Sequence, residues 1–146
     1  MADHTPATSS SDLRVIVVTP EQTVFDLTTD FVALPLFDGE LGVAINHAPM
    51  IGRLGYGELR IGHEPTQQRI YIDGGFVQVA DNLVSVLTNR AIPAKKLDVG
   101  IIEETIRHAT TQPAAGEDQI ARRDRVLTQA RAQLRVAKRT AGSSAH

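Results

Sequence analysis

Hydrophobic and polar residues along the first two thirds of the chain follow the pattern of short strands. Runs such as LRVIVV at 13–18 and DFVALPL at 30–36 are rich in β-branched and apolar residues. Turn signals separate the runs at intervals of about 8 to 16 residues, for example at 38–39, 55–57 and 73–75. This rhythm predicts an antiparallel β-sandwich. A parallel α/β fold would need helices between the strands, and the pattern offers none.

The pattern changes to a helical period after Pro93. Apolar residues at helical spacing predict a first helix over 94–109, and Pro113 and Gly116 then break it. A second helix is expected from Glu117 or Asp118, whose charges suit a helix N-terminus. Its narrow apolar seam is typical of a helix that packs on another helix and consists of Ile120, Leu127, Ala130, Leu134 and Ala137.

The chain is thus predicted to hold a flexible tail (1–12), a β-sandwich (13–93), a two-helix hairpin (94–141) and a second short tail (142–146). All six aromatic residues precede residue 77, which places the predicted core in the sandwich. The seam of the second helix includes two alanines, so it buries little apolar surface. We therefore expect a hairpin of low independent stability, the kind of element that moves in conformational switching.

Composition removes several classes of function. The chain has 146 residues, 42% hydrophobic and 22% charged, which fits one soluble globular protein. It has no cysteine, so disulfides, thiolate nucleophiles and sulfur-ligated zinc are excluded. A net charge of −2 gives no overall attraction to nucleic acid or anionic lipid. The sequence has neither a membrane-spanning apolar stretch nor a secretory signal pattern.

The stretch DGELGVAINHAP, at 38–49, raises the question of whether His47 is catalytic. A general base needs a positioned partner, a metal needs further ligands, and the other four histidines share no ligand spacing with it. The glycines lack phosphate-loop spacing. We therefore expect no catalytic residue, metal or cofactor, and a rigid loop in which His47 makes hydrogen bonds ahead of Pro49.

The second predicted helix is strongly basic, with seven Lys or Arg against three Asp or Glu between residues 117 and 139. Arg131, Arg135 and Arg139 stand one turn apart beside the apolar seam. An acidic protein surface would complement this stripe, and a plain solvated face would also explain it. Nucleic acid or an anionic membrane are further alternatives, although the helix lacks aromatic residues for base stacking or interfacial insertion.

Several short segments, in this order and spacing, resemble the epsilon subunit of bacterial F-type ATP synthases. They are GELGV at 39–43 with HAP at 47–49, GELRI at 57–61, YIDGGF at 71–76 with Val79 and 82–87, and AQLRV at 132–136. The resemblance covers nearly all of residues 13–140 and implies a β-sandwich followed by a helical hairpin. It implies a non-catalytic rotor subunit in the central stalk, on the cytoplasmic face of the bacterial membrane without insertion into it. An adaptor that binds nucleic acid or anionic membrane through the basic helix is the alternative.

By this resemblance the sandwich binds the gamma subunit, which is the rotor shaft, and rests on the ring of c subunits. Asp38 and Glu40 are expected to contact the ring, and Gly39, Gly42, His47 and Pro49 to support their loop. The hairpin lies folded beside the sandwich or extends along the shaft to inhibit ATP hydrolysis. Its extended form would meet a catalytic beta subunit through Arg122, Arg123, Arg125, Arg131 and Arg135.

One motif departs from the family pattern. Some members bind ATP through Ile or Leu, Asp, two variable residues, Arg and Ala at the start of the first hairpin helix. Here Leu97 and Asp98 are kept, but Ile101 and Ile102 replace the arginine and alanine. Loss of the guanidinium removes a bidentate phosphate donor. We expect at most weak nucleotide binding at Asp98.

Overall fold

The computed structural model describes residues 12–144, so the predicted N-terminal tail lies almost entirely outside the described residues. Eight strands come first: β1 (Leu13–Val18), β2 (Thr23–Thr29), β3 (Phe31–Leu36), β4 (Gly39–Ala44), β5 (Met50–Ile61), β6 (Gln68–Ala80), β7 (Leu83–Leu87) and β8 (Ala91–Pro93). A 3-10 turn η1 (Ala94–Lys96) and two helices, α1 (Val99–Thr111) and α2 (Glu117–Ser144), follow. The predicted β-sandwich with a helical hairpin is confirmed.

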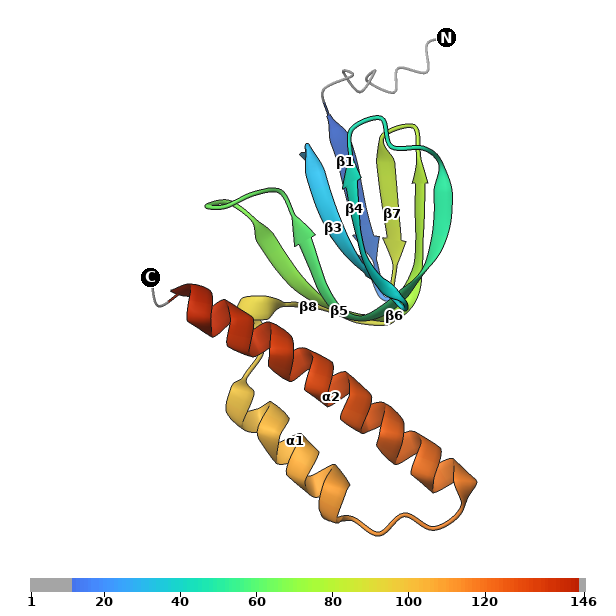
Figure 1. Cartoon of the computed structure of the whole chain (residues 1–146), viewed down its shortest axis with the longest axis vertical. Coiled ribbons are helices and arrows are strands. Elements are labelled where there is room, and N and C mark those ends of the chain that lie inside the picture. Colours follow the sequence, from blue (N-terminus) through green and yellow to red (C-terminus); the bar gives the residue numbers. More distant parts are fainter. Residues whose placement is uncertain (1–11, 145–146) are drawn as a thin grey trace.

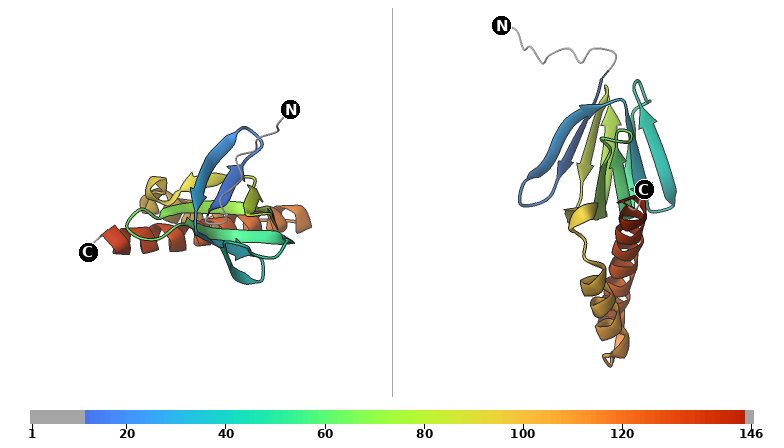
Figure 2. Two further views of the ribbon diagram at one scale, coloured as in Figure 1. Left: turned by 90° about the horizontal axis from the view of Figure 1, so that it is seen from above. Right: turned by 90° about the vertical axis from the view of Figure 1, so that its left-hand side faces the viewer.

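The strands form one sheet in the order β2-β1-β7-β6-β5-β3-β4, with β8 paired to β6. The sheet folds back on itself so that β1 and β2 lie opposite β3 and β4 (Figure 2, right). Pairing is antiparallel except between β1 and β7, which run parallel. The prediction of a purely antiparallel sandwich therefore needs this one correction.

Aliphatic side chains from β1, β3, β5, β6 and β7 fill the space between the two layers. The core is built by residues such as Val15, Leu34, Leu59, Val77 and Val86, each fully buried. The core lies in the predicted part of the chain, but it is built by aliphatic residues, and Phe25 packs against its edge only partly buried. Phe37 and Phe76 are 66% and 60% exposed, and Tyr71, which is fully buried, packs against the hairpin instead.

The sheet closes into a sandwich because β5 and β6 bend where their glycines meet. We expected turns at 55–57 and 73–75, but both strands run through these positions without interruption. Core positions on β6 are odd-numbered beyond the bend (Val77, Val79) and even-numbered before it (Ile70, Ile72). The bend therefore shifts the alternation by one residue and keeps both halves of the strand packed on the core.

Only glycine fits at the bend. Gly75 has a φ of +108°, and a Cβ atom there would collide with the carbonyl oxygen of Leu87. A Cβ at Gly55 would lie 2.9 Å from the carbonyl oxygen of Leu36. Since neither obstacle is a flexible side chain, both glycines are required for the close approach of neighbouring backbones.

The hairpin differs from its prediction in its boundaries. The first helix was expected over 94–109, but a 3-10 turn occupies 94–96 and α1 spans Val99–Thr111. Asp98 is the N-cap, since its carboxylate accepts a hydrogen bond of 3.1 Å from the backbone N–H of Ile101. At the other end, α2 continues to Ser144, three residues beyond the predicted end of the hairpin at 141.

The second helix packs on two sides. Ala130 and Ala137 of the predicted seam are buried and meet Ile102 of α1, whereas Ile120 is 40% exposed. Ala132 and Val136, on another side of α2, meet Tyr71 of the sandwich. Figure 1 shows that the C-terminal half of α2 lies against the sandwich while its N-terminal half projects away with α1.

Candidate interaction surfaces

The stretch 38–49 is not one loop. Residues 37–38 form the turn between β3 and β4, residues 39–44 are strand β4, and residues 45–49 form the loop before β5. Six strand residues span about 20 Å, so Asp38 and His47 lie at opposite ends of β4. The prediction that His47 holds Asp38 and Glu40 in place is therefore wrong.

The two predicted ring-contact carboxylates have different surroundings. Glu40 accepts a hydrogen bond of 2.7 Å from the guanidinium of Arg60, which is the main reason why the pKa of Arg60 is raised. Asp38 is exposed in the turn beside Phe37. Of the two carboxylates, Asp38 is thus the one that the sandwich leaves ready for a partner.

The loop after β4 is supported by a pair of asparagines that the sequence analysis missed. Asn82 Oδ1 accepts a bond of 2.6 Å from the backbone N–H of Asn46, and Asn82 Nδ2 donates to Asn46 Oδ1 at 3.2 Å. Both residues have positive φ, which asparagine tolerates well. His47 contributes only locally, with Nδ1 2.7 Å from the carbonyl oxygen of Ala48.

The other residues predicted to support the loop lie at separate positions along β4 and before β5. Gly39 begins β4 with a φ of +149°. Gly42 lies within β4, where a Cβ would come 3.1 Å from the Phe31 ring, so its lack of a side chain makes room for that ring. Pro49 is exposed and immediately precedes β5.

The outer side of the sheet carries an exposed apolar surface. Arg53, Phe76, Leu87 and Val18 lie side by side on β5, β6, β7 and β1, and Ile51 stands one outward position along β5 from Arg53. Ile51, Phe76 and Leu87 are 75%, 60% and 53% exposed. We call this surface, together with Phe37 of the β3–β4 turn, the apolar outer face.

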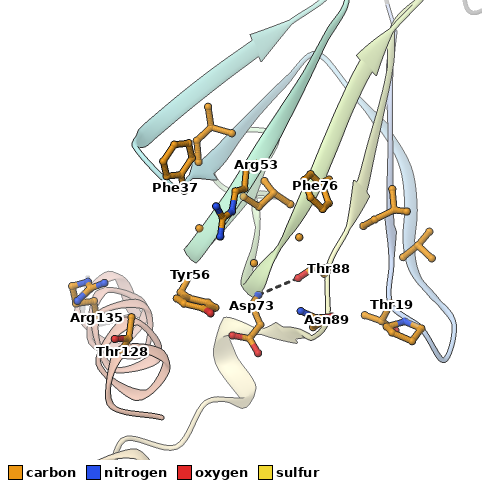
Figure 3. A pocket seen from close by; sticks show the side chains of 18 residues that line it. Thr19, Phe37, Arg53, Tyr56, Asp73, Phe76, Thr88, Asn89, Thr128 and Arg135 are labelled. Atoms are coloured by element: carbon orange, nitrogen blue, oxygen red, sulfur yellow. Dashed lines mark hydrogen bonds between the residues drawn. The ribbon is translucent and has the colours of Figure 1, made fainter. Parts of the chain in front are cut away.

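A groove of about 1140 Å³ runs along the apolar outer face toward α2. Figure 3 shows Phe37, Arg53 and Phe76 on its sandwich side and Thr128 and Arg135 on its helical side. The guanidinium of Arg53 lies 5.6 Å from the centre of the Phe37 ring, a cation–π distance. Isolated exposed apolar side chains are common, but a contiguous apolar patch on the outside of a sheet indicates an interaction site.

Two strands of this surface carry a signal in the sequence that the predictions above do not use. The segment 15–18 (VIVV) is continuously apolar, and 83–87 (LVSVL) nearly so. In a strand with only one buried face, apolar and polar residues should alternate, whereas a strand that is covered on both faces consists of a continuous run of apolar residues.

The predicted inhibitory arginines are not held by the sandwich. Arg122, Arg125, Arg131 and Arg135 are exposed and Arg123 is half-buried. The three nearer the N-terminus of α2 lie on the part of the hairpin that projects away from the sandwich (Figure 1). These arginines are thus open to solvent while α2 lies against the sandwich, whereas Arg139 of the basic stripe is bound to Glu58 of β5 at 3.1 Å.

The one predicted nucleotide-binding residue has a structural role. The Asp98 carboxylate caps α1, and a Cβ at Gly100 would lie 3.3 Å from its Oδ1. Ile101 stands at the arginine position of the nucleotide motif and is 66% exposed. Within the described residues, no group of three or more carboxylates and histidines is arranged to hold a metal ion.

Comparisons with known proteins agree with this architecture. Residues 12–94 match the family model of the ATP synthase Delta/Epsilon chain β-sandwich domain. The ATP synthase epsilon chain of Rhodopirellula baltica is 48% identical over 126 residues, covering 86% of this chain and 98% of that protein. The epsilon chain of Symbiobacterium thermophilum is 38% identical over 140 residues, covering 93% and 97%.

Solved structures share the fold. A chain of the Euglena gracilis mitochondrial ATP synthase OSCP/F1/c-ring assembly matches with a TM-score of 0.67 at 18% identity, covering 93% of this chain and 82% of that one. A chain of the Tetrahymena thermophila mitochondrial ATP synthase central stalk and c-ring matches with a TM-score of 0.65 at 15% identity, covering 86% and 96%. Fold and sequence together define a β-sandwich protein of the Delta/Epsilon class. Within that class, the chain belongs to the ATP synthase epsilon chain family.

The environment of Asp98 leads to a prediction about nucleotide binding. Because its carboxylate caps α1 and Ile101 supplies no guanidinium, isothermal titration of the full chain with ATP should give no binding in the micromolar range. Asp98→Ala should instead lower the free energy of unfolding by about 1 kcal/mol, because the N-cap is lost. Asp98→Ser should retain most of the stabilisation that the N-cap provides. Micromolar ATP affinity that Asp98→Ala abolishes would contradict this assignment.

Proposed function

We propose that the chain is a non-catalytic subunit of the ATP synthase central stalk. In this role the sandwich binds the rotor shaft, the gamma subunit, and rests on the c-ring, so that ion-driven rotation is passed between them. Membership of the epsilon chain family over both sandwich and hairpin supports the role. The observation that carries it is the apolar outer face, since a sheet exposing Ile51, Phe76 and Leu87 needs a partner to cover it.

The character of this face favours a protein partner. Arg53 is the cation at its centre, and Arg14, on β1 at the far side of the face, is paired with Asp26 at 2.8 Å. An anionic membrane would be attracted by several exposed cations on one face, and this face offers too few. The comparisons give no support to the alternative of an adaptor for nucleic acid or membrane.

The ring contact is proposed for the turn at Asp38, with Glu40 in a supporting position beside Arg60. An exposed carboxylate at a strand turn suits polar or basic loops on the ring. None of the described helices is long and apolar enough to cross a membrane. We place the chain at the cytoplasmic face of the bacterial membrane through its partners in the complex.

The shaft assignment is tested by removing apolar side chains from the outer face. The variant Phe76→Ser/Leu87→Ser should bind purified gamma subunit at least about tenfold more weakly, because truncation of a hot-spot side chain near the centre of an interface costs about 2 kcal/mol or more. The sandwich should remain folded, since both side chains are mostly exposed. Gln68→Ser, exposed at the opposite end of β6 and outside the apolar outer face, is the control and should bind normally. Wild-type affinity of the double variant would rule out this face.

The hairpin is proposed to act as a brake on ATP hydrolysis. Its basic stripe would meet an acidic segment of a catalytic beta subunit when the hairpin extends along the shaft. The exposure of four of the five arginines supports the proposal, because a partner could contact them without first breaking internal ion pairs. Arg123 is the exception, since its Nε lies 3.6 Å from Asp124.

Removing charge from the stripe tests the brake in the reconstituted complex. Replacing Arg122, Arg125, Arg131 and Arg135 by Gln should raise ATP hydrolysis several-fold and leave ATP synthesis little changed. Lys138→Gln removes an exposed charge from the same helix outside the set and should have no effect. Hydrolysis that stays at the parental rate after all four replacements would exclude an arginine-mediated brake.

A further inference from the structure

Two carboxylates of the sandwich lie almost completely buried under α2. The side chains of Glu58 on β5 and Asp73 on β6 are 2% and 9% exposed. They stand on the same outer surface, because Glu58 pairs with Tyr71 and Asp73 with Tyr56 in the β5–β6 ladder. Buried charges of this kind cost free energy unless they are paired, so their partners decide how α2 is held.

Asp73 has partners on both sides of the junction. From α2, the Gln129 amide nitrogen donates to both carboxylate oxygens at 3.1 Å. From the sandwich, the Tyr71 hydroxyl donates to Oδ1 at 2.9 Å, and Arg90 lies 3.6 Å from Oδ2. Burial and the neighbouring Asp73 charge raise the pKa of Tyr71 well above its ordinary value, so this hydroxyl keeps its proton and remains a donor.

Glu58, like Asp73, has partners from both α2 and the sandwich. From α2, Arg139 Nη1 lies 3.1 Å from Oε1. From the sandwich, Arg60 Nη1 lies 3.5 Å from Oε1, and Arg69 Nη1 lies 3.9 Å from Oε2. Glu58 Oε2 and Arg69 Nη1 are buried with no hydrogen-bond partner among the described residues, so this cluster is incompletely satisfied even with α2 in place.

The helix is not the only source of partners for the two carboxylates. It supplies Gln129 and Arg139, whose hydrogen bonds of 3.1 Å are shorter than the contacts of the sandwich arginines. Arg60, Arg69 and Arg90 of the sandwich nevertheless place three further cations 3.5 to 3.9 Å from the carboxylate oxygens. The apolar part of the junction is also small, with Ala132 and Val136 of α2 against Tyr71 and Ala94. When α2 leaves, neither carboxylate loses its last partner.

We propose that Glu58 and Asp73 form a latch that docks α2 through Gln129 and Arg139 and releases it without leaving an unpaired charge on the sandwich. The hairpin is therefore held by polar contacts. When α2 undocks, water and the arginines of the sandwich can take the place of Gln129 and Arg139 around the two carboxylates. This inference depends on the proposed brake only for its consequence in the complex. Its test uses the isolated full chain, so the latch can fail while the brake stands.

The test measures the distance between α2 and the sandwich directly. The chain has no cysteine of its own, so Thr28→Cys on β2 and Ala121→Cys on α2, both exposed, give two specific spin-label sites. In the parent, one docked distance should dominate. The variant Gln129→Ala/Arg139→Gln should shift the docking equilibrium roughly tenfold or more toward a longer, broader distance population. The urea midpoint of the sandwich should stay unchanged.

Two further variants distinguish a latch from general damage. Lys138→Gln, beside Arg139 but outside the latch, should keep the parental distances. Arg60→Gln removes a sandwich cation from Glu58, so α2 should stay docked at least as firmly as in the parent. The latch is overturned if Gln129→Ala/Arg139→Gln keeps the single docked distance, or if Arg60→Gln releases α2 as fully as that variant does.

Discussion

The bend that β5 and β6 share at their glycines is the constraint on which the other features depend. Gly75 and Gly55 allow the two longest strands to turn where backbones from β3 and β7 approach too closely for any side chain. The bend folds one sheet into a sandwich and shifts the inward positions by one residue. It also divides the outer surface, with Arg53 and Phe76 on one side and Glu58 and Tyr71 on the other.

The two parts of that surface differ in chemistry, and the difference matches the proposed roles. The apolar outer face presents Ile51, Phe76 and Leu87, whose burial against a shaft would give a stable, mainly hydrophobic contact. The part under α2 presents carboxylates with their own internal cations, which suits a contact that forms and breaks. Asp73, next to the bend, belongs to the latch and also lines the groove that leads to the apolar face (Figure 3).

The sequence was sufficient for the fold class and for the hairpin seam, because hydrophobic period and turn residues are local signals. It misplaced turns at 55–57 and 73–75, since a glycine pair in a bent strand looks the same as one in a turn. The glycines and Pro49 also predicted one loop over 38–49, although Asp38 and His47 lie at opposite ends of β4. Local sequence signals could not predict the contact of Asn46 with Asn82 or that of Glu58 with Arg139, because these residues are 36 and 81 positions apart.

We propose that the hairpin and the sandwich are separate folding units joined by a replaceable polar contact. Native-state hydrogen exchange on the isolated full chain tests it most directly, because the method resolves local openings from global unfolding. Amides of α1 and α2 should exchange together, through an opening of clearly lower free energy than the one that exposes the core amides of β6. Amides of α2 protected to the same free energy as those of β6 would contradict it.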